Sequence, residues 1–286
     1  MSKDALEPSL FNELFAAEGA SIGLQVKELL HKEQSPYQNI EIYDTTHFGH
    51  LMVLDGCIML TQRENFIYHE MMSHPALFSH PAPQKVVIIG GGDCGTLQEV
   101  LKHPEVETAL QVELDQRVTE LSEQYFPELC QSNNDSRAGF YFGDGIQWIK
   151  DAKEHSVDII IIDSTDPVGP AEGLFSTDFY RDCHRALKTN GILVQQSESP
   201  LFHSDSIIKK MQNDLCGSGF NDTLVRTFPQ PVYPSGWWSC TVGFKAGNKS
   251  TQAQNPLRPV NIETRYYTEE LHGASTKLPA FMLTKK

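Results

Sequence analysis

The sequence has 286 residues, of which 40% are hydrophobic and 21% are charged, so its composition is that of an ordinary globular protein. This length accommodates one large α/β unit together with a smaller unit. Because 37 acidic residues outnumber 23 basic ones, the formal net charge is −14, and so acidic a chain repels phosphate. We therefore expect no nucleic-acid partner.

The sequence also lacks the signals of export and of metal binding. No stretch approaches the ~18 apolar residues of a membrane helix, and the first residues lack the apolar core of a signal peptide. The 6 cysteines show no CxxC spacing, which favours reduced thiols in a cytoplasm over disulfides, and the 11 histidines show no HExxH-like spacing. We expect a cytoplasmic protein with no membrane span and no metal.

Short apolar runs separated by turn residues predict a small antiparallel β domain near the N-terminus. Partial helix is expected over residues 1–20, and strands are expected at 25–33, 38–43, 50–54 and 57–61. Asp55-Gly56 separates the last two strands, and Asp-Gly favours a type I′ hairpin turn because both positions need positive φ. So small a sheet is expected to pack on its neighbour or on a second subunit.

From residue 65 onward the pattern changes to helices and buried strands. A helix over 65–78 carries Tyr68, His69 and Glu70, and a linker follows at 79–84. Strands are then expected at 85–90, 108–115, 139–142, 157–162 and 191–196, and helices at 96–103, 116–126, from 146, and at 179–187; strands at 222–227 and 238–244 and a helix at 269–274 complete the chain. This alternation predicts a doubly wound parallel sheet, so we divide the chain into a β domain at 1–73 and an α/β domain at 74–286.

The stretch from Ile161 to Pro170 carries two acids directly after a buried strand. Asp163 ends the strand, Asp166 follows it, and Pro167, Gly169 and Pro170 fix a tight loop. Ligands of open α/β sheets bind at the carboxyl ends of the strands, where two carboxylates can hold a cation and accept its proton. The alternative is that Asp163 caps a helix and Asp166 is a solvated turn residue, because short motifs also occur by chance.

Acids and glycines follow the other predicted strands at the same edge. The loop Gly90–Gly95 follows the first strand, and Glu113 lies close to the position of a ribose-binding acid, about 20 residues further on. Asp115 is expected to be its solvent-exposed neighbour, and Asp144 follows the third strand. We interpret this edge as a nucleoside site, with ribose on Glu113 and the adenine amino group near Asp144.

Asp93, inside the glycine loop, indicates the charge of the ligand. A pyrophosphate binds bare N–H groups at a helix N-terminus, and a buried carboxylate beside it would be costly. S-adenosylmethionine offers a sulfonium and an ammonium group, but Asp93 would repel its carboxylate. The decarboxylated compound is therefore the better fit.

Together these motifs resemble the polyamine aminopropyltransferases, the spermidine synthase family, over nearly the whole chain. The resemblance depends on GGGDxG at 90–95, VELD at 112–115, GDG at 143–145 and DSTDPVGPAEGLF at 163–175, with support from SPYQNI at 35–40, LDG at 54–56, FIYHEMM at 66–72, VYPSGWW at 232–238 and RYYTEELHGA at 265–274. It implies a small N-terminal β domain followed by a Rossmann-like domain of the methyltransferase type, assembled as a homodimer or homotetramer.

The resemblance also implies a reaction and a role for each matching residue. An aminopropyl group would move from decarboxylated S-adenosylmethionine, a co-substrate, to putrescine, giving spermidine and methylthioadenosine without another cofactor. Asp163 would be the general base. The donor would contact Gln38, Asp93, Glu113, Asp144 and Gly145, and the acceptor would contact Tyr68, His69, Asp166, Gln196 and Tyr233.

The sequence departs from the family pattern at three places. Cys94 replaces a common glycine as a small residue, and Met59 replaces a glutamine, which weakens the polar contacts expected near the nucleoside. Leu14-Phe15 stands where many members have Trp-Phe beside the far end of the acceptor, which leaves the length of the acceptor open. Cadaverine and agmatine are therefore alternative acceptors. A diamine N-methyltransferase is a second reading, which Asp93 opposes, and a catalytically silent polyamine- or nucleoside-binding protein is a third, which the presence of Asp163, Tyr68 and Tyr233 opposes.

Overall fold

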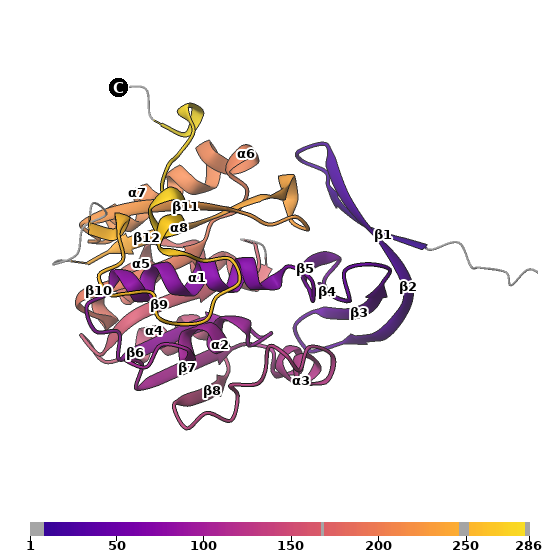
Figure 1. The fold of residues 1–286 in the computed structure, drawn as a ribbon, viewed down its shortest axis with the longest axis horizontal. Coiled ribbons are helices and arrows are strands. Elements are labelled where there is room, and N and C mark those ends of the chain that lie inside the picture. Colours follow the sequence, from indigo (N-terminus) through magenta and orange to yellow (C-terminus); the bar gives the residue numbers. More distant parts are fainter. Residues whose placement is uncertain (1–8, 167–168, 246–251, 284–286) are drawn as a thin grey trace, which may run out of the picture.

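The computed structural model describes residues 9–166, 169–245 and 252–283 of the chain. A five-stranded antiparallel sheet near the N-terminus is followed by a seven-stranded sheet with helices on both faces (Figure 1). Within the described ranges, no helix combines the length and the apolar character that crossing a membrane would require. The α/β fold with a preceding antiparallel β domain agrees with the sequence prediction.

The N-terminal sheet follows chain order, with each strand hydrogen-bonded to the next. Its strands are β1 (Ser9–Phe15), β2 (Ala20–Gln34), β3 (Asn39–Thr45), β4 (His50–Leu54) and β5 (Cys57–Thr61). The predicted turn between β4 and β5 is confirmed, because φ is 49° at Asp55 and 87° at Gly56. Figure 1 shows that β1 and β2 form a long hairpin extending away from the rest of the molecule.

The prediction of helix over residues 1–20 is wrong for the residues that the structure describes. Residues 1–8 lie outside the described ranges, and β1 pairs with β2 over Ser9–Phe15. The spacing of Leu10, Leu14 and their phenylalanine neighbours imitates a helical period, but the strand exposes 62% of Leu10 and 69% of Leu14 and buries Glu13 between them. Pairing along the whole hairpin therefore outweighs a local period.

The order in which the chain adds strands to the seven-stranded sheet reverses near the centre of the sheet. Its strands are β6 (Lys85–Gly90), β7 (Thr108–Glu113), β8 (Ala138–Phe142), β9 (Val157–Asp163), β10 (Leu187–Gln196), β11 (Asp222–Pro229) and β12 (Trp237–Phe244), in the spatial order β11-β12-β10-β9-β6-β7-β8. The chain moves outward from β6 through β7 to β8 and then returns to β9 on the other side of β6. This reversal makes a crevice at the carboxyl ends of β6 and β9, where ligands of such sheets bind.

Helices cover both faces because the central strands are apolar on both sides. The helices are α1 (Asn65–Ser79), α2 (Gly95–Leu101), α3 (Gln116–Tyr125), α4 (Gly145–Asp151), α5 (Thr177–Ala186), α6 (Pro200–His203), α7 (Lys209–Gly217) and α8 (Glu269–Ala274). Ile88 faces a core shared with α1 and α2, whereas Ile89 faces a core shared with α4, α5 and α7. The domain boundary expected after Ser73 falls inside α1, and that division stays a prediction.

A buried carboxylate ties α1 to the C-terminal part of the chain. The side chain of Glu70 is fully buried and accepts backbone N–H groups from Arg265 at 2.7 Å, Tyr266 at 2.9 Å and Tyr267 at 2.7 Å. Hydrogen bonds to an ionised acceptor are stronger than neutral ones. Tyr68 lies on the same helix, two residues before Glu70. The contact at Glu70 therefore also fixes the position of a side chain in the crevice.

The ends of β6 and β9 meet in a very close backbone contact. Gly90 pairs with Asp163 in register, has a φ of 83°, and would bring an added Cβ within 2.2 Å of the Asp163 carbonyl oxygen. The same oxygen accepts the N–H of Gly91 at 2.8 Å. Only glycine satisfies both the left-handed backbone and the missing space, so the loop after β6 lies directly on the end of β9.

Substituting Glu70 tests the anchor between α1 and the C-terminal segment. Glu70→Gln replaces a charged acceptor with an amide that cannot accept all three bonds, so we expect the free energy of unfolding to fall by about 1.5–3 kcal/mol. Urea unfolding measures it, with the exposed Glu28→Gln on β2 as the matched control. Equal midpoints for the two variants would show that the three bonds stabilise nothing.

Gly56 and Gly90 have nearly the same φ, so comparing them separates the cost of a positive φ from the cost of a steric clash. Gly56 has a φ of 87° and no neighbour within 4 Å of an added Cβ, whereas Gly90 has a φ of 83° and the Asp163 contact. We expect Gly56→Ala to cost about 1–2 kcal/mol for positive φ alone, and Gly90→Ala to cost about 1–3 kcal/mol more for overpacking. Urea midpoints of both variants check this, and equal losses would contradict the close contact.

Candidate active site

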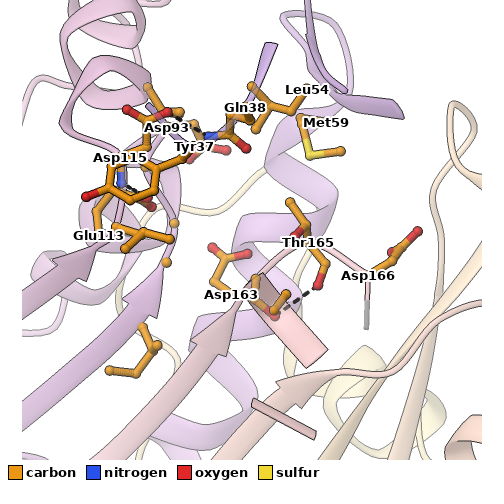
Figure 2. A pocket seen from close by; sticks show the side chains of 18 of the residues that line it. Tyr37, Gln38, Leu54, Met59, Asp93, Glu113, Asp115, Asp163, Thr165 and Asp166 are labelled. Carbon is orange, nitrogen blue, oxygen red and sulfur yellow. Dashed lines mark hydrogen bonds between the residues drawn. The ribbon is translucent and has the colours of Figure 1, made fainter. Parts of the chain in front are cut away.

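A cavity of about 420 Å³ lies in the crevice between β6 and β9 and is closed on one side by the N-terminal sheet. Figure 2 shows Asp163 near its centre, with Glu113 and Asp115 to the left, Gln38 above and Asp166 to the right. Its charged lining residues are all acidic: Asp55, Asp93, Glu113, Asp115, Asp144, Asp163 and Asp166. Among the described residues, no lysine or arginine lines it, so it suits a cationic ligand.

Asp163 is held by two neutral hydroxyl groups. Tyr68 donates to its Oδ1 at 2.7 Å, and Thr96 donates to its Oδ2 at 2.6 Å. Burial, together with the nearby charge of Asp93, raises the pKa of Asp163, while His69 and the two hydrogen bonds oppose the rise. The carboxylate is thus oriented without a cationic partner in direct contact. Sequence reasoning missed Thr96, because nothing in the pattern of α2 points toward β9.

Tyr68 and Tyr233 lie together beside Asp163. Their rings make an edge contact with centroids 5.9 Å apart, and the Tyr233 hydroxyl donates to the carbonyl oxygen of Met59. Burial and the charge of Asp163 raise the pKa of both phenols well above the usual value, so both stay protonated. They can therefore orient a ligand amine through hydrogen bonds but cannot act as bases near neutral pH.

Asp93 and His69 form a buried pair. His69 Nε2 lies 3.1 Å from Asp93 Oδ2, and Asp93 Oδ1 accepts the N–H of Gly95 at 2.7 Å. Burial alone lowers the pKa of His69, but the charge and hydrogen bond of Asp93 outweigh it and raise the pKa to about 9. The sequence assigned Asp93 to the donor and His69 to the acceptor, whereas the structure brings their side chains together.

The end of the cavity that contains Gln38, Glu113 and Asp115 joins the two sheets. Gln38, after β2, donates through Nε2 to Asp115 Oδ2 at 3.0 Å, and Ser35 donates to the same oxygen at 2.6 Å. Asp115 is 2% exposed and caps α3 by accepting the N–H of Arg117, so the expectation that it faces solvent is wrong. Burial raises the pKa of Glu113 to about 7.

Asp144 and Gly145 line the same cavity at the start of α4. Asp144 Oδ1 accepts the backbone N–H groups of Ile146 at 2.8 Å and Gln147 at 3.3 Å, so this residue is the N-cap of the helix. A Cβ on Gly145 would meet Ile89 at 2.6 Å, which explains the glycine by packing. The cap orients the Asp144 carboxylate at the rim of the cavity.

A second, smaller pocket of about 40 Å³ adjoins the first and is lined by Tyr68, Asp166, Gln196 and Tyr233. Glu13 also lines it, accepts the N–H of Ile58 at 2.7 Å, and has its pKa raised to about 7 by burial. Glu198 lies beside Asp166, is 3% exposed, and has its pKa raised to about 10 by burial and by Asp166. Four predicted acceptor residues thus share one pocket with an acid that the sequence analysis missed.

The two missed acids differ in how they could have been found. Glu198 follows the end of β10, so the rule that identified Asp163 also applies to it. Glu13 lies on β1, where helix was expected, and its approach to the pocket depends on the hairpin. No local signal identifies it.

The structure shows where the residues that depart from the family pattern lie. Cys94 is completely buried with a φ of 69°, which favours a small packing residue over an accessible thiol. Met59 lines both pockets and accepts the Tyr233 hydrogen bond through its backbone. Leu14 is 69% exposed and is absent from the lining of either pocket.

The comparisons with known proteins agree with this geometry. Residues 65–255 match the spermine/spermidine synthase domain, and residues 10–62 match the spermidine synthase tetramerisation domain. The chain is 56% identical over 281 residues to the polyamine aminopropyltransferase of Thioalkalivibrio sulfidiphilus, covering 98% of this chain and 99% of the relative. It is 54% identical over 271 residues to that of Methylococcus capsulatus, covering 95% and 94%.

Solved structures of spermidine synthases have the same fold. The enzyme from Thermotoga maritima matches with a TM-score of 0.88 at 34% identity, covering 98% of this chain and 95% of that one. A spermidine synthase in complex with the transition-state analogue AdoDATO matches with a TM-score of 0.89 at 34% identity, covering 98% and 96%. The chain therefore belongs to the spermidine synthase family and is an enzyme of the polyamine aminopropyltransferase type.

Proposed function

We propose that this enzyme transfers the aminopropyl group of decarboxylated S-adenosylmethionine to putrescine, giving spermidine and methylthioadenosine, with Asp163 as the general base. One observation carries the proposal: the adjoining pockets are lined by acids and, among the described residues, by no lysine or arginine. Both substrates are cations. The likeness to a spermidine synthase that binds AdoDATO gives further support.

Proton removal is the first requirement of the reaction. An aliphatic amine with a pKa near ~10 is mostly protonated at neutral pH and is then no nucleophile. Asp163 accepts that proton, and the Tyr68 hydroxyl that already donates to it keeps the carboxylate oriented. A positioned general base contributes ~10²–10⁴ in rate.

Group transfer then follows without any change of oxidation state. The neutral nitrogen attacks the methylene carbon next to the sulfonium, a C–N bond forms, and the C–S bond breaks with its electron pair going to sulfur. Methylthioadenosine leaves as a neutral thioether, so the reaction needs no cofactor beyond the co-substrate. Holding both reactants in register supplies most of the acceleration.

The two pockets divide between the substrates. In the larger cavity, Glu113 takes the ribose hydroxyls, Gln38 holds Asp115 beside them, and Asp144 and Gly145 take the adenine. Asp93 takes the ammonium of the aminopropyl group. This assignment places the sulfonium next to Asp163.

The smaller pocket takes the acceptor. The reacting nitrogen lies between Tyr68, Tyr233 and Asp163, and the distant ammonium lies among Asp166, Glu13 and Gln196. A pocket of about 40 Å³ closed by carboxyl groups favours a short diamine over the bulkier guanidinium of agmatine. Putrescine is therefore preferred, with cadaverine, one methylene longer, as the nearest alternative.

An N-methyltransferase is the second candidate on this scaffold. It would use intact S-adenosylmethionine, whose carboxylate would enter a cavity lined by acids. The repulsion disfavours that donor. A silent binding protein, the third candidate, gives no reason for the two hydroxyl groups that orient Asp163.

Assembly through the N-terminal sheet is part of the proposal. Residues 10–62 match a tetramerisation domain, and the β1–β2 hairpin exposes Leu10, Leu14 and Leu29. Burying such side chains favours association. We propose a homo-oligomer, a dimer or a tetramer.

Mass spectrometry of the products tests the reaction class. Purified enzyme is given putrescine with either decarboxylated or intact S-adenosylmethionine, and then cadaverine or agmatine in place of putrescine. We expect spermidine and methylthioadenosine from the decarboxylated donor, with putrescine the fastest acceptor. Methylated diamine from the intact donor would replace the proposal by the methyltransferase reading.

Substituting Asp163 separates binding from chemistry. Asp163→Asn keeps the shape of the side chain but removes the proton acceptor, so we expect turnover to fall by about 10²–10⁴. Methylthioadenosine affinity, measured by calorimetry on the same preparation, should change little and serves as the folding control. Turnover equal to that of the unmodified enzyme would remove Asp163 from the base role.

A further inference from the structure

The carboxylate that would receive the ammonium of the donor already has a partner inside the protein. His69 Nε2 lies 3.1 Å from Asp93 Oδ2, with 3% of the His69 side chain and 16% of the Asp93 side chain exposed. The His69 ring packs into the space that Gly95 leaves, since a Cβ at Gly95 would lie 2.2 Å from it. The structure thus has a place for the imidazole directly against Asp93.

The surroundings of His69 favour its charged form. Asp93 faces it from the loop after β6, Asp163 from the end of β9 and Glu99 from α2, and all three raise its pKa, to about 9, against the effect of burial. Tyr68, its neighbour on α1, contacts the ring edge-on and is neutral. Glu99 is itself paired with His74 at 3.0 Å and Lys102 at 2.7 Å.

A second cation at Asp93 changes this balance. An ammonium group bound there would lie beside the imidazolium in a site shielded from water, where like charges repel strongly. The ammonium cannot give up its proton cheaply, because its pKa is near ~10. The imidazolium of His69, with a pKa of about 9, loses its proton more readily than the ammonium does.

We propose that His69 is a specificity-determining residue of the donor site. Its imidazolium is the internal counterion of Asp93, and the ring releases a proton when the donor ammonium becomes the counterion of Asp93 instead. This inference rests on the proposed function. The N–H bond at His69 Nε2 breaks, the pair of electrons stays on the ring, and the proton passes to solvent buffer. No redox partner is involved.

The release makes donor affinity depend on pH in a defined direction. Below the pKa of His69 the donor must displace one proton, so its affinity rises about tenfold for each pH unit. A ligand without the ammonium, such as methylthioadenosine, leaves the pair intact and lacks this dependence. Near pH 7 His69 neutralises Asp93 in the empty enzyme, and the affinity for the donor is lower as a result.

Other groups in the cavity also exchange protons, so the test needs matched ligands. Glu113, with a pKa near 7, faces the ribose in every nucleoside ligand, and Asp163 faces the sulfonium. Decarboxylated S-adenosylhomocysteine keeps the aminopropyl ammonium but carries a neutral thioether, and methylthioadenosine is the same thioether with a methyl group in place of the aminopropyl group. The difference between these two ligands isolates the ammonium site.

Calorimetry in buffers of different ionisation enthalpy counts the protons released. At pH 7.5 we expect about one more proton to be released with decarboxylated S-adenosylhomocysteine than with methylthioadenosine. Between pH 6.5 and pH 8.5 the affinity ratio of the two ligands should rise by a factor of roughly 30 to 100. His69→Gln, which keeps a hydrogen-bonding side chain but carries no proton, should abolish both differences.

His31→Gln is the matched control, because His31 also pairs with a carboxylate, Glu33 at 2.8 Å, but lies on β2 away from the cavity. It should behave as the unmodified enzyme does. Equal proton release for the two ligands in the unmodified enzyme, or an undiminished difference in His69→Gln with methylthioadenosine affinity retained, would overturn the inference. If His69→Gln loses methylthioadenosine binding, the pH series of the unmodified enzyme decides alone.

The outcomes also distinguish this inference from the proposed function. If both ligands bind with equal proton release, only the proposed role of His69 is contradicted. Failure of the unmodified enzyme to bind either ligand overturns the nucleoside assignment and the inference together.

Discussion

The contact between the end of β6 and the end of β9 determines where the chemistry of this enzyme can occur. Gly90 and Gly91 lie against the backbone of Asp163, and no larger residue fits at Gly90. That contact directs the Asp163 side chain into the crevice, where hydroxyl groups from α1 and α2 hold it. The Asp163 side chain is positioned by backbone packing first and by hydrogen bonds second.

The same crevice concentrates acidic side chains, of which Asp93 is paired with His69, and the titration of Glu113 links stability to pH. Folding raises the pKa of Glu113 from 4.5 to about 7, so the folded chain holds this proton more tightly than the unfolded chain does. The stabilisation is complete below pH 4.5 and is lost as the pH rises through about 7. Burial is the main cause of the raised pKa and the charges of Asp115 and Asp163 add to it, so ionising Glu113 near neutral pH costs stability.

The site residues that the strand pattern alone revealed lie at the ends of strands. Asp163 and Glu113 end β9 and β7 and Asp144 follows β8, so periodicity alone brings them to one edge. Glu13 and Thr96 could not be found in this way, because Glu13 reaches the smaller pocket from the side of a strand and Thr96 reaches Asp163 from a helix. Their positions depend on how β1 and α2 pack. The fold class followed from strand–helix alternation, whereas the strand at Ser9–Phe15 did not, since its apolar spacing imitates a helix.

The glycines of the loop after β6 are required by the protein's own packing. In a loop at this edge of a sheet, glycines usually allow the close approach of a ligand. In the structure the neighbours that forbid a side chain are the Asp163 backbone at Gly90 and the His69 ring at Gly95. At Gly90 and Gly95 the protein itself fills the space beside the loop, although Gly90, Gly91 and Gly92 also line the cavity. It follows that a substitution at Gly90 or Gly95 would displace Asp163 or His69 whether or not a ligand is bound.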